Sequence, residues 1–309
     1  MILTAGLTPA WQQVLVFDTF HLGEVNRAQE ARWCASGKVC NAGVAAHLLG
    51  GPSLTLAAAG GYPLVEMNRD FDRLGVPRRW VRTQAATRVC TTVLDRATGT
   101  ITELVENGRP LMPSELEEFR AAYAQEAAKA EFALIMGSLP SGVPETFYRD
   151  LVERTRSPVA LDFRGRGLLS VLDLKPFVVK PNRDELALTI GRPLDSDAEL
   201  FAAMQSLNRG GAQWVVITHG SEPVWITSQA AVYRVFPPPV QDVVNPIGCG
   251  DVLAAAIAHA TLEGYDLVRA VRLGVAAAAA NLRNLLPGRF DPSRIEHEAA
   301  LVRVEEGPG

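Results

Sequence analysis

The first part of the chain contains short runs of apolar and β-branched residues that are typical of strands. Such runs lie at residues 2–7, 13–20 and 28–34, with turn signals at Thr8-Pro9 and Gly23. Two more, at 88–95 and 100–105, flank the segment Arg96-Ala97-Thr98-Gly99 and predict a hairpin. The segments before about residue 110 are therefore expected to supply a β-rich part.

Helical and strand patterns alternate through the rest of the chain. We expect helices at 42–49, 64–74, 114–128, 144–154, 184–189, 198–208, 252–262 and 267–283, and strands at 54–59, 78–81, 132–136, 159–162, 177–179, 214–218, 224–227 and 231–235. Near-continuous apolar strands between helices indicate a parallel sheet covered on both faces. The pattern predicts one α/β domain over residues 1–309, with the last 20 or so residues frayed.

Composition and charge narrow the class of protein. The chain is 48% hydrophobic and 21% charged, with 30 basic and 34 acidic residues and a net charge of −4. Because no basic block stands out, a nucleic-acid or anionic-membrane partner is not expected, and any anion site must be local. The four cysteines match neither a metal pattern nor a disulfide framework, and no apolar run reaches about 18 residues. These features favour a cytoplasmic protein without a membrane span.

The motif NPIGCGD at 245–251, followed by an Ala-rich run, is typical of a strand end, a glycine turn and a helix start. Gly248 and Gly250 flank Cys249, so successive backbone N–H groups can point at one anion at the positive end of the helix. A carboxylate at Asp251 would repel that anion unless it takes a proton from an attacking hydroxyl. Alternatively, Asp251 only caps the helix and the glycines only make the turn.

Other polar turns follow predicted strands, at GSLPSGV (137–143), KPNRDEL (180–186) and Thr218-His219-Gly220. In open parallel sheets, ligands bind beyond the carboxyl ends of the strands. Asn182 and Glu185 are three residues apart at a helix start and could hold Mg²⁺ through water beside nucleotide phosphates. The same spacing also fits a capping box, with Asn182 as the cap.

The ordered pieces GKVCN at 37–41, GSLPSGV, KPNRDEL and NPIGCGD resemble the signatures of the ribokinase-like, phosphofructokinase B family of carbohydrate kinases. The resemblance covers essentially the whole chain. Together with GEVNR at 23–27, it is nearest to the phosphosugar members, 1-phosphofructokinase and tagatose-6-phosphate kinase. It implies a three-layer αβα sandwich with a mainly parallel sheet, and a small β-sheet lid from segments within about 8–36 and 86–110.

The resemblance implies ATP-dependent transfer of the γ-phosphoryl group to a hydroxyl of a phosphorylated ketohexose, of the tagatose 6-phosphate or fructose 1-phosphate type. Asp251 would be the general base, and the N–H groups of Gly248, Cys249 and Gly250 would form the anion hole. ATP and Mg²⁺ would be the cofactors, and a monovalent-cation requirement stays open. A lid that pairs with a second lid would give a homodimer.

The resemblance also places residues on the two substrate sides of the site. On the sugar side it implies Gln12, Arg27, Gly37, Lys38, Asn41, Arg88 and Ser138. On the nucleotide side it implies Asn182, Thr218, Gly220, Gly248, Gly250 and Asn284, with Glu185 reaching the metal through water.

Two positions depart from the family pattern where the sugar would bind. Gln12 stands where an aspartate is usual, and Val39 where a glycine follows the lysine. An amide accepts hydroxyl hydrogens less strongly than a carboxylate. Two alternatives therefore stay open: a kinase for an unphosphorylated sugar or nucleoside, and a non-catalytic homologue that only binds sugar phosphate or nucleotide.

Overall fold

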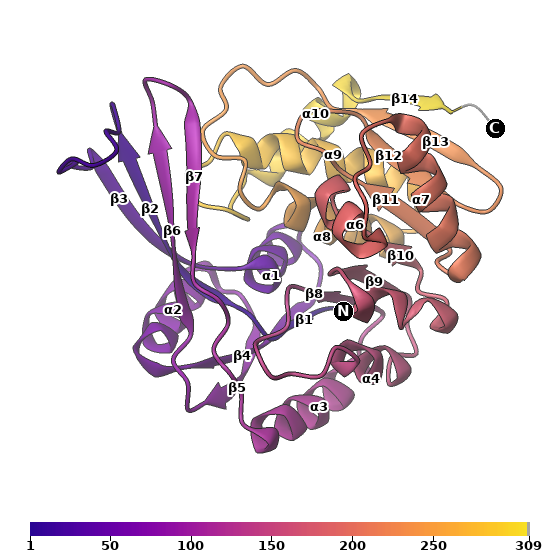
Figure 1. Ribbon diagram of the computed structural model, residues 1–309, viewed down its shortest axis with the longest axis horizontal. Helices are drawn as coiled ribbons and strands as arrows, with labels where there is room; N and C mark the ends of the chain where they lie inside the picture. Colours follow the sequence, from indigo (N-terminus) through magenta and orange to yellow (C-terminus); the bar gives the residue numbers. More distant parts are fainter. Residues whose placement is uncertain (308–309) are drawn as a thin grey trace.

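A computed structural model describes residues 1–307 of the chain and has two sheets (Figure 1). In sheet order, the strands of the main sheet are β14 (Arg303–Glu306), β13 (Val232–Phe236), β12 (Val224–Thr227), β11 (Trp214–Ile217), β10 (Val178–Val179), β9 (Val159–Asp162), β8 (Phe132–Met136), β1 (Ile2–Gly6), β4 (Ser53–Gly60) and β5 (Arg78–Thr83). The seven strands from β11 to β5 run parallel. The remaining three strands, β12, β13 and β14, extend one edge of the sheet in antiparallel orientation.

Helices cover both faces of this sheet. One face carries α1 (Lys38–Leu48), α2 (Gly61–Leu74), α8 (Cys249–Leu262), α9 (Leu267–Leu282) and α10 (Ile295–Leu301), and the other carries α3 (Pro113–Ala127), α4 (Phe147–Glu153), α5 (Arg166–Leu169), α6 (Arg183–Ile190) and α7 (Asp197–Gly210). Two 3₁₀ turns, η1 (Leu172–Leu174) and η2 (Pro292–Arg294), complete the described elements. The predicted three-layer α/β fold with a mainly parallel sheet is confirmed.

Strand β8 shows how the sequence divides the core into two halves. Phe132, Leu134 and Met136 pack in the cluster that contains α1 and α8, whereas Ala133 and Ile135 pack in the cluster that contains α3 and α4. Because successive side chains on a strand point to opposite faces, a continuous apolar run is what a sheet covered on both sides requires.

The second sheet has four strands, in the order β3 (Glu30–Ser36), β2 (Ala10–Phe17), β6 (Arg88–Asp95) and β7 (Thr100–Val105). It stands beside the main sheet, at the left of Figure 1. Its strands β6 and β7 form the hairpin predicted from the turn at residues 96–99. The strand β2 that leads into it continues directly from β1 of the main sheet through residues 7–9.

Two predictions about elements are wrong. The first helix begins at Lys38 and not at residue 42, because Gly37, at φ 83°, makes the turn that the helix needs immediately before Lys38. The predicted frayed end instead contains α10 and β14, because β14 pairs with β13 and Val302 is buried. Residues 308–309 of the predicted frayed end lie outside the described residues.

No helix in residues 1–307 is both long and apolar enough to cross a membrane.

Candidate active site

The N-termini of α1 and α8 meet beyond the carboxyl ends of the strands β9 and β10. Asp162 is the last residue of β9, and Lys180 follows β10 directly. Each lies two residues after a side chain, Ala160 or Val178, that packs in the cluster of α1 and α8. The alternation of side chains therefore turns Asp162 and Lys180 toward the same two helices.

Asp162 is the centre of a buried network of charges. Its Oδ1 lies 2.6 Å from Lys38 Nζ and its Oδ2 lies 2.9 Å from Lys180 Nζ. Lys38 also contacts Glu185 Oε1 at 2.7 Å. Burial by itself would raise the pKa of Asp162, but the two ammonium groups hold that pKa below its ordinary value. Burial likewise opposes the charge of Lys38, but Asp162 and Glu185 raise its pKa, so both groups are charged at neutral pH.

Asp251 lies in the first turn of α8 and is only 7% exposed. Burial raises its pKa to about 7, and the neighbouring Asp162 adds to the rise. Lys38, a hydrogen bond from Asn41 and Lys180 act in the opposite direction. A carboxyl group with a pKa near neutrality can both accept and release a proton under cellular conditions.

The interpretation of Asp251 as a helix cap is wrong. Residue Gly248 occupies the cap position, with φ 82°, and no side chain caps the helix. The carboxylate of Asp251 instead accepts a hydrogen bond from Asn41 Nδ2 at 2.8 Å, across 210 residues of sequence. Asp251 is therefore turned toward α1 and away from its own backbone.

The glycine turn leaves two backbone donors without a protein acceptor. Cys249 N donates to Pro246 O at 3.3 Å, so the third donor of the predicted anion hole is engaged within the protein. Within residues 1–307, neither Gly248 N nor Gly250 N donates to a backbone acceptor. A Cβ at position 248 would lie 2.9 Å from Pro287 Cβ, so this site also requires glycine for space. Two open N–H groups at a helix N-terminus suit an anion.

Asn41 is fully buried, and both the oxygen and the nitrogen of its side-chain amide form hydrogen bonds. Its Oδ1 accepts from Ser36 Oγ at 2.9 Å, and its Nδ2 donates to Asp251. One N–H of Asn41 remains for a further partner. The contacts make it an orienting partner of Asp251, and its predicted contact with sugar hydroxyls stays a prediction.

Asn182 and Glu185 form a reciprocal capping box at the start of α6. Glu185 N donates to Asn182 Oδ1 at 2.7 Å, and Asn182 N donates to Glu185 Oε2 at 3.1 Å. The capping alternative for these residues is therefore confirmed. Since Oε1 of Glu185 also contacts Lys38, both carboxylate oxygens are engaged.

A direct metal site is not formed by these side chains. Within residues 1–307, no group of three or more His, Cys, Asp or Glu side chains is placed to hold a metal ion. A carboxylate oxygen can accept a second hydrogen bond, so Glu185 fits only a contact through water to a Mg²⁺ that is carried by nucleotide phosphates. That contact stays a prediction.

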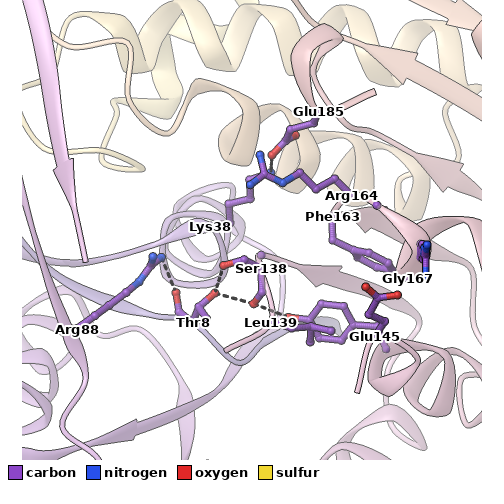
Figure 2. Close-up of a pocket in the computed structure, with 14 residues that line it drawn as sticks. Thr8, Lys38, Arg88, Ser138, Leu139, Glu145, Phe163, Arg164, Gly167 and Glu185 are labelled. Atoms are coloured by element: carbon purple, nitrogen blue, oxygen red, sulfur yellow. Dashed lines mark hydrogen bonds and ion pairs between the residues drawn. The ribbon is translucent and has the colours of Figure 1, made fainter. Parts of the chain in front are cut away.

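A cavity of about 440 Å³ opens beside this network (Figure 2). Lys38, Arg88, Thr8, Ser138 and Glu185 line it, together with residues 163–167, Tyr148 and Glu145. Thr8 Oγ1 donates to Ser138 O at 3.0 Å, and the two hydroxyl oxygens are 3.3 Å apart. The structure thus places three of the predicted sugar-side residues, Lys38, Arg88 and Ser138, around one cavity.

Lys38 and Arg88, the two cations among these three residues, still have N–H groups that form no hydrogen bond within the described part of the protein. Lys38 uses two of its three N–H bonds on Asp162 and Glu185. Arg88 donates to the carbonyl oxygens of Thr8, Pro9 and Glu106, and within residues 1–307 it has no ion pair. Arg88 therefore contributes a net positive charge to the cavity wall.

The remaining predicted residues are spread around this centre. Gln12 is buried in the small sheet and donates to Thr92 Oγ1 at 2.7 Å. Arg27 is exposed in the connection between β2 and β3. Thr218 bridges to Asn182, Gly220 follows it in an exposed turn, and Asn284 lies just beyond α9, where it donates to Ala280 O. Gly37 leaves no room for a side chain, since a Cβ there would lie 2.8 Å from Thr8 O.

Asp162 and Lys180 were missed as site residues. The available signal was a buried strand, Val159–Asp162, that ends on a carboxylate, and a lysine directly after the next strand. Neither signal identifies a partner, because the two residues meet only through the pairing of β9 with β10.

Comparison with known proteins identifies the family. The sequence model of the pfkB family of carbohydrate kinases matches residues 10–292. A structure described as a possible 1-phosphofructokinase from Thermotoga maritima has 22% identity and a TM-score of 0.91, covering 100% of both chains.

Two further solved structures share the fold. Phosphofructokinase-2 from Escherichia coli in complex with potassium has 24% identity and a TM-score of 0.86, covering 97% of this chain and 98% of that one. Other structures of that enzyme are in complex with fructose-6-phosphate or show a tetrameric inhibited form. Ribokinase from Arabidopsis thaliana, complexed with ribose and ATP, has 19% identity and a TM-score of 0.75, covering 96% and 98%. The fold is ribokinase-like.

Proposed function

The chain belongs to the pfkB family of carbohydrate kinases, and from this premise we propose that it phosphorylates a hydroxyl of a phosphorylated ketohexose. The family makes it an ATP-dependent sugar kinase. The proposal adds the class of acceptor, of the tagatose 6-phosphate or fructose 1-phosphate type, and the roles of individual residues.

One observation carries the choice of a phosphorylated acceptor. Arg88, without an ion pair in residues 1–307, lines the cavity beside Lys38 and Ser138. A neutral sugar needs hydroxyl-binding groups and no uncompensated cation, whereas a phosphate dianion pairs with one. Names of relatives point the same way: the Thermotoga maritima structure is described as a possible 1-phosphofructokinase, and the Escherichia coli enzyme has been solved with fructose-6-phosphate.

In the proposed mechanism, Asp251 accepts the proton of the acceptor hydroxyl while the hydroxyl oxygen bonds to the γ-phosphorus. The bond from that phosphorus to the β–γ bridging oxygen breaks, and ADP keeps the electron pair. The open N–H groups of Gly248 and Gly250 would stabilise the charge on the transferred group. Asn41 holds the Asp251 carboxylate in place, and positioning of this kind supplies much of the rate in phosphoryl transfer.

Mg²⁺ bound to the nucleotide phosphates would neutralise part of their charge, with Glu185 holding it through water. Asn182, Thr218, Gly220 and Asn284 would border the nucleotide, and Gln12, Gly37 and Arg27 would complete the acceptor side. The proposal includes a monovalent-cation requirement, since the Escherichia coli relative has been solved with potassium.

We also propose a homodimer that pairs the small sheets. Trp33 on β3 and Leu104 on β7 are 38% and 58% exposed, and the register through Gln13 and Thr91 places both on the same face of the small sheet.

A panel assay of ADP release tests the proposed function. Purified protein is given ATP, Mg²⁺ and, separately, tagatose 6-phosphate, fructose 1-phosphate, fructose 6-phosphate, the unphosphorylated sugars and nucleosides. The proposal predicts kcat/KM at least a hundredfold higher for one phosphosugar than for its unphosphorylated form. A preference for a neutral sugar or nucleoside contradicts it, and the absence of ADP release with every acceptor in the panel would favour a binding protein without turnover.

A further inference from the structure

The loop at residues 163–167, Phe-Arg-Gly-Arg-Gly, forms one wall of the cavity and presents two arginines. In Figure 2, the side chain of Arg164 extends across the cavity toward Lys38 and Glu185, and Arg88 lies on the opposite wall. Both Arg164 and Arg166 are exposed. Within residues 1–307, neither guanidinium group forms an ion pair or donates a hydrogen bond. Their donors are therefore available to a ligand.

The backbone that carries these arginines is fixed. The ring of Phe163 is buried against Tyr148, with 4.7 Å between ring centroids. Gly165, at φ 78°, donates its N–H to Thr189 Oγ1 at 2.9 Å. A Cβ at position 167 would lie 2.8 Å from Glu145 O, which shows how closely the loop packs on the segment before α4. Only the side chains of Arg164 and Arg166 are left to adapt to a ligand.

The charge of the cavity is opposite to that of the whole chain. Its wall contains the four cations Lys38, Arg88, Arg164 and Arg166 and the two carboxylates Glu145 and Glu185. Its lining therefore carries a net charge of +2, on a chain of net charge −4. A concave surface with a net charge concentrates counter-ions. Guanidinium groups present paired donors that match phosphate oxygens.

We propose that Arg164 and Arg166, together with Arg88 on the opposite wall, bind a phosphate group and determine the specificity of the cavity for anionic ligands. The inference rests on the proposed function for its role in catalysis. The phosphate belongs either to the sugar acceptor or to the terminal phosphates of the nucleotide, and both sources share the chemistry that the arginines recognise.

Binding of inorganic phosphate tests the site directly. Isothermal titration calorimetry compares the wild type with the double variant Arg164→Ala/Arg166→Ala, the double variant Arg164→Lys/Arg166→Lys and a control, Arg209→Ala, at an exposed position in the last turn of α7. We expect the dissociation constant for phosphate to rise at least tenfold in the alanine variant. The rise should be smaller in the lysine variant, which keeps the charge without the forked donors, and absent in the control.

Steady-state kinetics of the same variants distinguish the two sources of phosphate. A tenfold rise in KM for the phosphosugar with unchanged KM for ATP assigns the site to the acceptor, and the reverse assigns it to the nucleotide. Phosphate binding that is unchanged in the alanine variant overturns the inference. If the wild type phosphorylates no acceptor, the proposed function fails, but the calorimetry still tests this site.

Discussion

Asp251 sits between charges of both signs, and these set its protonation. Burial and Asp162 raise its pKa to about 7, while Lys38, Asn41 and Lys180 limit the rise. A general base must be unprotonated to accept a proton, so the proposed role requires the ionised form. Activity is therefore expected to fall as the pH decreases through about 7.

Replacing Lys180 tests this balance of charges around Asp251. Lys180 is 3% exposed and pairs with Asp162, and its charge lowers the pKa of Asp251. Lys180→Met removes the charge, so the acid limb of kcat/KM should move to higher pH, by on the order of one unit. A pH profile between 5 and 9 measures the shift. Lys129→Met, at an exposed lysine, is the matched control.

An acid limb that stays in place, or that moves to lower pH, would argue against Asp251 as the titrating base. A general loss of activity without a change in the pH profile would mean that Lys180 only supports the fold.

Residues of the site that belong to one local motif could be predicted from the sequence, whereas contacts between distant segments could not. The glycine turn and Asp251 were predicted because they form one local motif. The contact between Asn41 and Asp251, and the ion pairs of Asp162, join segments that are distant in sequence. The motif at Asn182 and Glu185 was ambiguous, since the same spacing serves a capping box and a ligand contact.

The start of α8 depends on the left-handed turn at Gly248. Gly248 has φ 82°, whereas Gly250 has no positive φ, and a Cβ there would meet only Lys180 Nζ at 3.4 Å. Gly248→Ala should therefore lower the free energy of unfolding by roughly 1–3 kcal/mol through strain and the contact with Pro287. Gly250→Ala should change it by less than about 1 kcal/mol.

Urea unfolding of both variants measures this difference. Equal stabilities would contradict the geometry of the turn. Because Gly250→Ala places a methyl group beside one of the two open N–H groups, it should still lower kcat even where stability is kept.

Elements were predictable where periodicity is strong and local. Strands such as Phe132–Met136 and Val159–Asp162 were predicted with their observed bounds, because each is an uninterrupted apolar run between polar turns. The order of the strands in the sheet does not follow from such patterns. The terminal elements α10 and β14 are short and rich in charge. They form because β14 pairs with the free edge of β13 and because Val302, between the two elements, is buried.

At the scale of the whole molecule, the small sheet is the surface that is expected to assemble. Leu104 on β7 is 58% exposed. Leu188 on α6 is 63% exposed and lies outside this sheet, so it provides a control position. If the small sheets pair, Leu104→Arg should raise the dimer dissociation constant at least tenfold, because it places a charge in an apolar interface. Leu188→Arg should leave it unchanged.

Light scattering coupled to size-exclusion chromatography, over a range of protein concentrations, measures this change. A wild type that is monomeric at all concentrations, or a dimer that survives Leu104→Arg, would contradict the proposed pairing.

The central claim is that Asp251 takes the proton of the acceptor hydroxyl. Rapid-quench measurement of single-turnover transfer of the γ-phosphoryl group, in the wild type and in Asp251→Asn, tests it most directly. The variant keeps the shape of the side chain, so the dissociation constant for ATP and the midpoint of unfolding should stay close to wild type. The rate of transfer should fall by about a thousandfold. Transfer within threefold of the wild-type rate would contradict the account.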